Sequence, residues 1–307
     1  MGASTQDLQK DGLIGLSEVA AQDMPAGSLY VVALPIGNAA DITLRALWIL
    51  SNVDAIASED TRVTRPLLAR FGIRTPMIAA HQHNEREMAQ QIVGRLARDE
   101  RIALVTDAGT PAVSDPGALI VRAVLDVGRR VIPIPGASSA VAALSASGLG
   151  AGPFVFAGFL PAGANERERA LRLLAADGKP FVLFEAPHRI SDLAAQLHSA
   201  LEPERRVVLA RELSKKFETI SVHVAGDLAT LEVEERGEYV VLVDVAPAAR
   251  SDSNDTADID PAVTRWLAAL LEEMAPARAA AIAAKVSGLP RQSLYALALR
   301  LKSPAQH

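Results

Sequence analysis

The sequence contains no cysteine, which excludes disulfide bridges, thiolate zinc sites and a cysteine nucleophile. Aromatic residues make up only 4 % of the chain, too few for a broad platform on which single-stranded nucleic acid would stack. No apolar run reaches the roughly 20 residues that a membrane-spanning helix needs. The N-terminal stretch lacks a basic segment followed by an apolar core, so it does not resemble a secretory signal. These absences predict a globular cytoplasmic protein.

Several common catalytic and nucleotide-binding patterns are also missing. The chain has no Gly-x-Gly-x-x-Gly after a strand and no Gly-x-x-x-x-Gly-Lys-[Ser/Thr]. The sequence therefore does not predict the usual phosphate-binding loops for dinucleotides or nucleoside triphosphates. It also lacks His-Glu-x-x-His and Gly-x-Ser-x-Gly. His81 and His83 have a spacing that would suit a metal, but no third ligand accompanies them. We therefore expect no metal site.

Hydrophobic residues are abundant, at 50 % of the chain, and they follow strand-like and helix-like periods in turn. Strand and helix patterns alternate as far as the Gly-rich stretch at 148–153, which predicts an α/β domain with a parallel sheet. Strands are more frequent beyond it, with helices expected near 165–176, 190–200 and 226–235. The fold class is therefore α/β with two main domains. The predicted divisions are a flexible tail at residues 1–26, a first domain at 27–147, a second mixed domain at 148–247, a linker at 248–260 and a helical module at 261–307.

Three loops rich in Gly, Pro and Ser each follow a predicted strand of the first domain, at residues 34–38, 106–117 and 134–139. Each loop alone has the residue types that are common in any turn. Because the carboxyl ends of parallel strands meet at one edge of a sheet, the three together predict a binding crevice.

The motifs in these loops, and others along the chain, resemble the tetrapyrrole-methylase superfamily, and most closely its branch of small-subunit ribosomal RNA cytidine 2′-O-methyltransferases. The resemblance covers about residues 28–302 and departs mildly at Ala137, where the family usually carries proline. The motifs that carry it run from Leu34 to Leu47, Ser58 to Arg62, Asp107 to Pro111, Ser114 to Gly117, Ile134 to Ser138, Phe159 to Pro161, Pro187 to Arg189 and Arg211 to Thr219.

The resemblance implies a tetrapyrrole-methylase-like fold that binds S-adenosylmethionine in the cleft between two α/β domains, normally as a homodimer. It implies 2′-O-methylation of a cytidine ribose in the decoding region of 16S rRNA, within the small ribosomal subunit. The implied cofactor-binding residues are Pro35, Ile36, Gly37, Asp107, Ala108, Gly109, Thr110, Pro111, Val113, Ser138 and Ser139 in the first domain, and Phe184, Ala210, Leu213, Tyr239 and Val240 in the second.

A ribose hydroxyl is a weak nucleophile, and a positioned base or a nearby cation assists its attack. We infer that Glu59, Asp60 and Arg62 orient the acceptor and that Glu212 or Lys215 activates it. The alternative is that these acids and bases only pair with one another.

The helical module carries six basic and two acidic residues in a chain whose net charge is −5. Its helix-turn-helix outline suggests contact with nucleic acid, and a simple capping role fits the same pattern. We predict RNA contacts by Arg189, Lys216, Arg291 and Arg300. Two other functions stay open: methylation of a tetrapyrrole precursor, and a non-catalytic RNA-binding or ribosome-assembly factor on the same scaffold.

Overall fold

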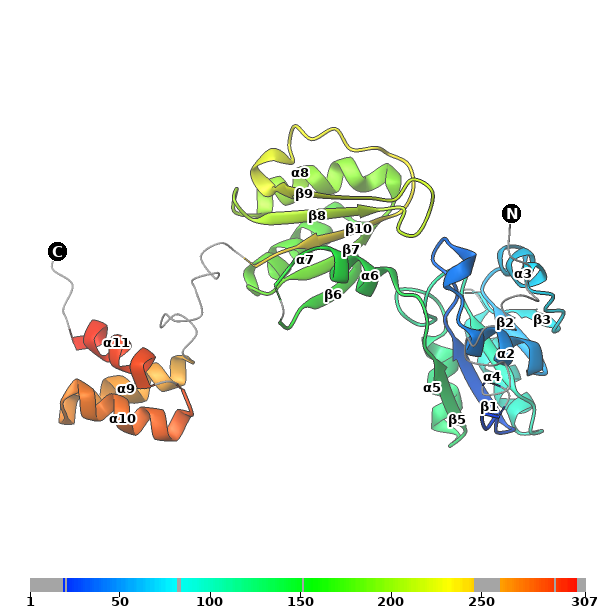
Figure 1. Ribbon diagram of the computed structural model, residues 1–307, viewed down its shortest axis with the longest axis horizontal. Coiled ribbons are helices and arrows are strands. Elements are labelled where there is room, and N and C mark those ends of the chain that lie inside the picture. Colours follow the sequence, from blue (N-terminus) through cyan, green and yellow to red (C-terminus); the bar gives the residue numbers. More distant parts are fainter. Residues whose placement is uncertain are drawn as a thin grey trace, which may run out of the picture.

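The computed structural model describes residues 19, 21–81, 84–150, 152–245, 260–289 and 291–302 (Figure 1). Most of the predicted tail and nearly all of the predicted linker lie outside the described residues. His83, one of the two histidines whose spacing would suit a metal, also lies outside them. Among the described residues, no group of three or more His, Asp or Glu side chains could hold a metal ion. No helix in this part of the chain is long and apolar enough to cross a membrane.

The first domain is built on a five-stranded sheet in the order β3-β2-β4-β1-β5, and every pair in it is parallel. Strand β4 is buried along its whole length, as expected of a parallel strand covered on both faces. The strands are β1 (Ser28–Val32), β2 (Ala55–Ser58), β3 (Met77–Ala79), β4 (Ile102–Val105) and β5 (Arg130–Ile134).

Helices cover both faces of this sheet. On one face, Ile49 of α2 and Leu68 of α3 pack with Tyr30 and Val32 of β1. On the other, α4 and α5 pack on the alternate residues of the same strands, including Leu29. This alternation follows the two-residue period of a strand. The elements on the two faces are η1 (Ala39–Asp41), α2 (Leu44–Asn52), α3 (Thr61–Arg70), α4 (Glu85–Leu96) and α5 (Ala118–Asp126).

The second domain has a mixed sheet in the order β6-β7-β10-β8-β9, in which only β6 and β7 are parallel. Helices α7 and α8 pack on one face and α6 on the other. Helix α6 therefore belongs to the second sheet by its packing, although it precedes the boundary predicted at 147, which stays a prediction. The elements are α6 (Ser139–Ala146), β6 (Val155–Phe159), α7 (Ala164–Ala176), β7 (Phe181–Glu185), η2 (Pro187–Arg189), α8 (Ile190–Ala200), β8 (Arg206–Arg211), β9 (Thr219–Val224), η3 (Ala225–Asp227) and β10 (Tyr239–Val243).

The helix predicted over 226–235 is wrong: the structure has only the single turn η3 there. Leu231 and Val233, two residues apart, both pack against the core of this domain. An extended chain brings every second residue to one side, whereas a helix does not. Core packing therefore overrides the local helical tendency.

The C-terminal module consists of three helices, α9 (Pro261–Glu273), α10 (Pro276–Ser287) and α11 (Arg291–Lys302). Asp260 caps α9 by accepting a hydrogen bond from the backbone N–H of Ala262 at 2.7 Å. Gly288, with φ of 72°, ends α10 in the left-handed conformation that glycine adopts most readily. Leu267, Ala280 and Leu294 form the centre of a small core of its own.

Candidate active site between the two sheets

A cavity of about 340 Å³ lies between the first and second domains. Its walls come from the strand-end loops of the first sheet and from the ends of β7 and β10 in the second. The lining residues are Ile36, Ala108, Gly109, Thr110, Val113, Ser114, Asp115, Ser138, Ser139, Phe159, Phe184, Glu185, Ala186, Pro187, Leu213, Glu238, Tyr239 and Val240.

Direct hydrogen bonds tie the three predicted loops of the first domain together. Leu34 and Gly109 exchange two backbone bonds, of 2.9 and 3.1 Å. The Thr110 hydroxyl donates to the carbonyl of Ala137 at 3.2 Å. The loop after β4 also holds Ala112 and Ser114 at φ of 66° and 63°, in the left-handed region that non-glycine residues rarely adopt. Such strain is typical of functional sites.

Glu85 anchors the far end of this loop. Its carboxylate, in a residue that is only 8 % exposed, accepts from the backbone N–H groups of Gly117 and Leu119, both at 2.9 Å. These are donors at the start of α5, which a helix leaves without internal partners. The loop from Asp107 to Gly117 is thus held at both ends.

A buried ion pair holds the wall from the second domain. Glu185 and Arg167 are 2 % and 4 % exposed, and their side chains meet at 2.5 Å. Arg189 lies 3.3 Å from the other carboxylate oxygen of Glu185, and Gln196 accepts from Arg167 at 2.6 Å. This network fixes the turn at Glu185 to Pro187, which lines the cavity.

Carboxylates gather on the first-domain side of the cavity. The side chain of Asp107 accepts from the backbone N–H of Asp60 at 3.1 Å, which joins the loops after β2 and β4. Burial raises the pKa of Glu59, and the nearby charge of Asp107 raises it further. Partial burial also raises the pKa of Asp115, to about 6, with help from the charges of Glu59 and Asp107. The first-domain side of the cavity therefore has an acidic cluster, of which Asp115 lines the cavity itself.

Asp60 and Arg62 form a local ion pair at 2.6 Å, as expected if these acids and bases pair with one another. The Arg62 guanidinium and backbone N–H lower the pKa of Asp60 to about 2. Asp60 also caps α3 by accepting from that N–H at 2.8 Å. A carboxyl with so low a pKa is a poor proton acceptor at neutral pH.

Lys215 bridges Glu212 and Glu238, at 2.7 and 2.9 Å. Burial lowers the pKa of Lys215, but the bonds to these two glutamates raise it by more, so the net shift is upward. Burial raises the pKa of Glu212, and its bond to Lys215 reverses this to a net lowering. Lys215 is thus a cation rather than a base. A β-carbon on Gly37 would overlap the Lys215 side chain, so the two domains touch closely here.

Eleven of the sixteen predicted cofactor-binding residues line the cavity. The other five lie behind or beside its walls. Pro35 and Pro111 are buried in their loops, Gly37 meets Lys215, Asp107 bonds to Asp60, and Ala210 is buried beneath α6. Their roles stay predictions. The eleven lining residues are Ile36, Ala108, Gly109, Thr110, Val113, Ser138, Ser139, Phe184, Leu213, Tyr239 and Val240.

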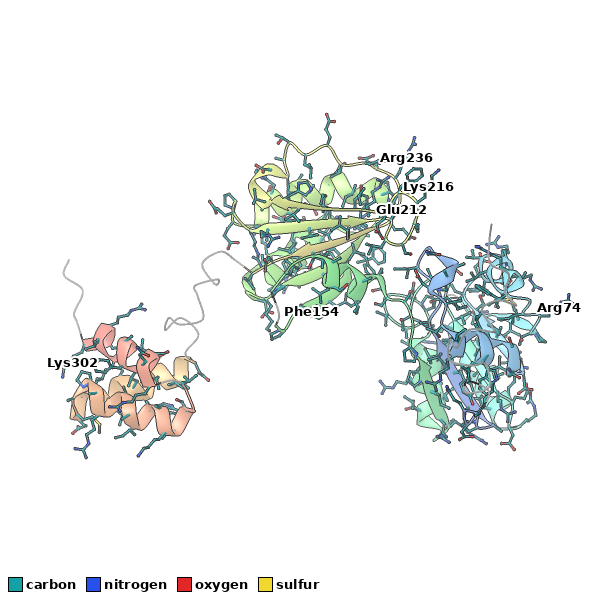
Figure 2. All side chains as sticks on the ribbon, in the orientation of Figure 1. Arg74, Phe154, Glu212, Lys216, Arg236 and Lys302 are labelled. Atoms are coloured by element: carbon teal, nitrogen blue, oxygen red, sulfur yellow. The ribbon has the colours of Figure 1, made fainter. Side chains whose placement is uncertain are left out.

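The set predicted to contact RNA is dispersed. Arg189 is engaged with Glu185 inside the second domain. Lys216 is exposed above the Phe217 ring, 5.3 Å from its centre (Figure 2). Arg291 and Arg300 lie exposed on α11.

Seven residues that line the cavity were not predicted from the sequence to do so. They are Ser114, Asp115, Phe159, Glu185, Ala186, Pro187 and Glu238. All of them except Glu238 fall in or beside the motifs that carry the family resemblance, so their position in these motifs could have identified them.

Two family models cover most of the chain. The model for Tetrapyrrole (Corrin/Porphyrin) Methylases matches residues 28–229, and the RsmI C-terminal HTH domain matches residues 257–302. Among solved structures, uroporphyrin-III-C-methyltransferase from Thermus thermophilus is 20 % identical with a TM-score of 0.51, over 71 % of this chain and 94 % of that one. The methyltransferase CobJ is 21 % identical with a TM-score of 0.55, over 72 % and 95 %. The predicted two-domain tetrapyrrole-methylase fold is confirmed.

Curated relatives are considerably closer in sequence. Ribosomal RNA small subunit methyltransferase I from Pseudomonas aeruginosa is 43 % identical over 281 residues, which are 90 % of this chain and 98 % of the relative. The protein of the same name from Haemophilus influenzae is 42 % identical over 277 residues, or 89 % and 96 %. With the tetrapyrrole-methylase cavity and the C-terminal helical module both present, the chain belongs to the ribosomal RNA small subunit methyltransferase I family.

Proposed function

We propose that this methyltransferase transfers a methyl group from S-adenosylmethionine to the ribose 2′-hydroxyl of a cytidine in the decoding region of 16S rRNA, acting on the small ribosomal subunit. The observation that carries the proposal is the cavity between the two domains, which combines Asp115 on the first-domain side with the apolar side chains of Phe159, Phe184 and Leu213 from the second domain. The names of the curated relatives, which specify small-subunit rRNA, support the choice of acceptor.

The residues present fit such a methyl donor. The cavity volume is within the range of small-molecule sites. Thr110, Ser138 and Ser139 offer hydroxyls and backbone groups, and Gly109, at φ of 72°, lets the backbone come close to a ligand. S-adenosylmethionine carries a net positive charge near neutral pH, which the carboxylates of Asp107 and Asp115 attract.

The bound donor supplies a methyl group attached to a sulfonium, which the acceptor oxygen displaces in line. The chain contributes alignment and an environment poor in water. Phe159 and Phe184 meet edge to face at 5.6 Å and form the apolar wall together with Leu213. Asp115 lines the cavity and has a raised pKa, of about 6, so it is the first-domain carboxylate best suited to take the hydroxyl proton. Lys215, held as a cation by two glutamates, supports charge developing on the acceptor oxygen.

Donor binding is expected to weaken as the pH falls through 6. The pKa of Asp115 is raised in the folded protein, so its charge is lost near pH 6 rather than near 4, and a cationic ligand loses an attractive partner. Calorimetry should show affinity for S-adenosylmethionine falling roughly tenfold between about pH 7 and pH 5. The neutral analogue S-adenosylhomocysteine and the Asp115→Asn variant are the controls. If either shows the same dependence as wild type with S-adenosylmethionine, Asp115 does not set it.

Transfer of a labelled methyl group tests the proposed function directly. Unmodified small subunits are incubated with the enzyme and labelled donor, and the rRNA is digested to nucleosides. We expect the label in 2′-O-methylcytidine. Label on a base, or no transfer despite tight donor binding, would contradict the proposal, and the latter result would favour a non-catalytic assembly factor.

A tetrapyrrole precursor as acceptor is not favoured, because the relatives that share over 40 % identity are named for ribosomal RNA. The likeness to tetrapyrrole enzymes at about 20 % identity concerns the fold alone. The two acceptors also differ in their need for the helical module. Removing residues 261–307 should impair methylation of the subunit, whereas a tetrapyrrole enzyme would have no use for this module.

A homodimer is part of the same proposal. Val141 on α6 and Ile220 and Val222 on the edge strand β9 are exposed, at 60 %, 38 % and 52 %. Ile220 and α6 also share the lining of a second hollow. An edge strand with exposed branched apolar residues is a surface that proteins commonly cover. Sedimentation at several concentrations would report the state of association.

A further inference from the structure

The helix α3 and the turn after it form the most densely basic segment of the first domain. Between residues 61 and 76 the sequence has Arg62, Arg65, Arg70 and Arg74 and no acidic residue. The whole chain, by contrast, has a net charge of −5. A patch of this kind in an acidic protein calls for a partner of opposite charge.

The arginines of α3 all lie outside the face that packs on the sheet. Thr64 and Leu68 are 1 % and 2 % exposed and turn toward the sheet. With 3.6 residues per turn, Arg62 and Arg70 fall on the side opposite these two residues and Arg65 lies on a flank of the helix, and all three arginines are exposed. Arg74 follows the buried Ile73 and extends into solvent at the outer edge of the domain (Figure 2). The helix rise places Arg62 and Arg70 about 12 Å apart along its axis.

In the part of the chain that the structure describes, the guanidinium groups of Arg65, Arg70 and Arg74 have no hydrogen-bond or ion-pair partner. Exposed arginines elsewhere are often paired: Arg98 with Glu100, Arg122 with Asp126 and Arg172 with Glu168. An unpaired guanidinium keeps its full fork of donors, a geometry that matches phosphate oxygens.

The position of α3 links the basic face to the site. The helix begins at Asp60, whose backbone N–H bonds to Asp107 in the loop that walls the cavity. Asp115 lines the cavity with the carboxylates of Glu59 and Asp107 close to it, and this acidic cluster repels phosphate. An RNA strand that places one ribose at the cavity must therefore neutralise its flanking phosphates elsewhere, and α3 offers the cations. Val63 and Phe71, 49 % and 37 % exposed, add apolar surface among them.

We propose that α3 and the turn to Arg74 form a docking surface for the sugar-phosphate backbone of the rRNA that flanks the methylated nucleotide. The inference rests on the proposed function and adds a recognition surface to it. Phosphate contacts of this kind set the position of the strand and carry no sequence information.

The test is a triple variant, Arg65→Gln, Arg70→Gln and Arg74→Gln, assayed on unmodified small subunits. KM for the subunit should rise at least tenfold, while kcat and the affinity for S-adenosylmethionine stay unchanged. The slope of log(kcat/KM) against log[salt] should become shallower by about 2 to 3, since each of the three lost phosphate contacts removes about 0.7 to 0.9. The matched control, Arg122→Gln, Arg169→Gln and Arg172→Gln, removes the same charge from exposed positions on α5 and α7 and should change KM less than twofold.

Two results would overturn the proposal. One is a KM for the α3 variant that equals that of the control. The other is a raised KM with an unchanged salt slope, which would indicate contact with a ribosomal protein. Neither result affects the proposed function, which depends on where wild-type enzyme deposits the methyl group. Circular dichroism and an unchanged donor affinity establish that the variant is folded.

Discussion

Replacing Glu185 with glutamine is expected to lower the free energy of unfolding by about 3 kcal/mol, one of the largest effects of any single substitution in this protein. The change keeps the shape of the side chain and removes its charge. Arg167, only 4 % exposed, then remains as a buried cation with no carboxylate beside it. Thermal or urea unfolding measures the effect, and each kcal/mol corresponds to roughly 2–4 °C in Tm.

Helix α7 provides the matched control for this experiment. Glu168 also pairs with an arginine of α7, Arg172, at 2.6 Å, but both side chains are largely exposed. Glu168→Gln should therefore change stability by less than about 1 kcal/mol. Equal effects of the two substitutions would mean that the buried network does not hold the turn from Glu185 to Pro187. Because that turn lines the cavity, Glu185→Gln should also weaken donor binding, whereas Glu168→Gln should not.

Replacing Glu85 with leucine is expected to cost about 2 kcal/mol and to reduce affinity for S-adenosylmethionine by tenfold or more. The substitution leaves the N–H groups of Gly117 and Leu119 without their acceptor, so the loop that walls the cavity loses its anchor. Calorimetry with the donor measures the loss.

Glu85→Gln separates the anchoring role from the charge. The amide oxygen of glutamine can accept the same two hydrogen bonds, so this variant should keep most of the affinity. An affinity that falls equally in both variants would show that the charge, rather than the hydrogen bonds, is what the loop requires. An affinity unchanged in both would show that the loop keeps its shape without Glu85.

Local patterns were sufficient to predict most of the fold. The strand pattern at 102–106 predicts β4 to within a residue, and the helical periods at 165–176 and 190–200 coincide closely with α7 and α8. The three loops after the first-domain strands meet as predicted, because parallel strands bring their carboxyl ends to one edge. The helix predicted over 226–235 is wrong, because the extended form of this segment depends on packing against a core formed by distant residues.

The interactions that hold the site together could not be predicted from the sequence. Glu85 and Gly117 are separated by 32 positions, and Arg167 and Glu185 by 18. Charged residues in amphipathic stretches are normally solvated, so nothing local distinguishes the buried Arg167 from the exposed Arg172 on the same helix. The pKa of Asp115 likewise depends on carboxylates from other loops. Such properties arise only when distant segments meet.

The order of the strands has a consequence for how the chain folds during synthesis. Strand β1 is made first, yet it lies between β4 and β5, so neither of the next two strands to be made, β2 and β3, pairs with it. About 100 residues separate β1 from β5, which at ribosomal rates of about 5–20 residues per second is a wait of roughly 5–20 s. The second sheet has the same arrangement in reverse, since β10, its last strand, fills the centre between β7 and β8. Neither sheet can therefore be completed before its last strand, β5 or β10, has been synthesised.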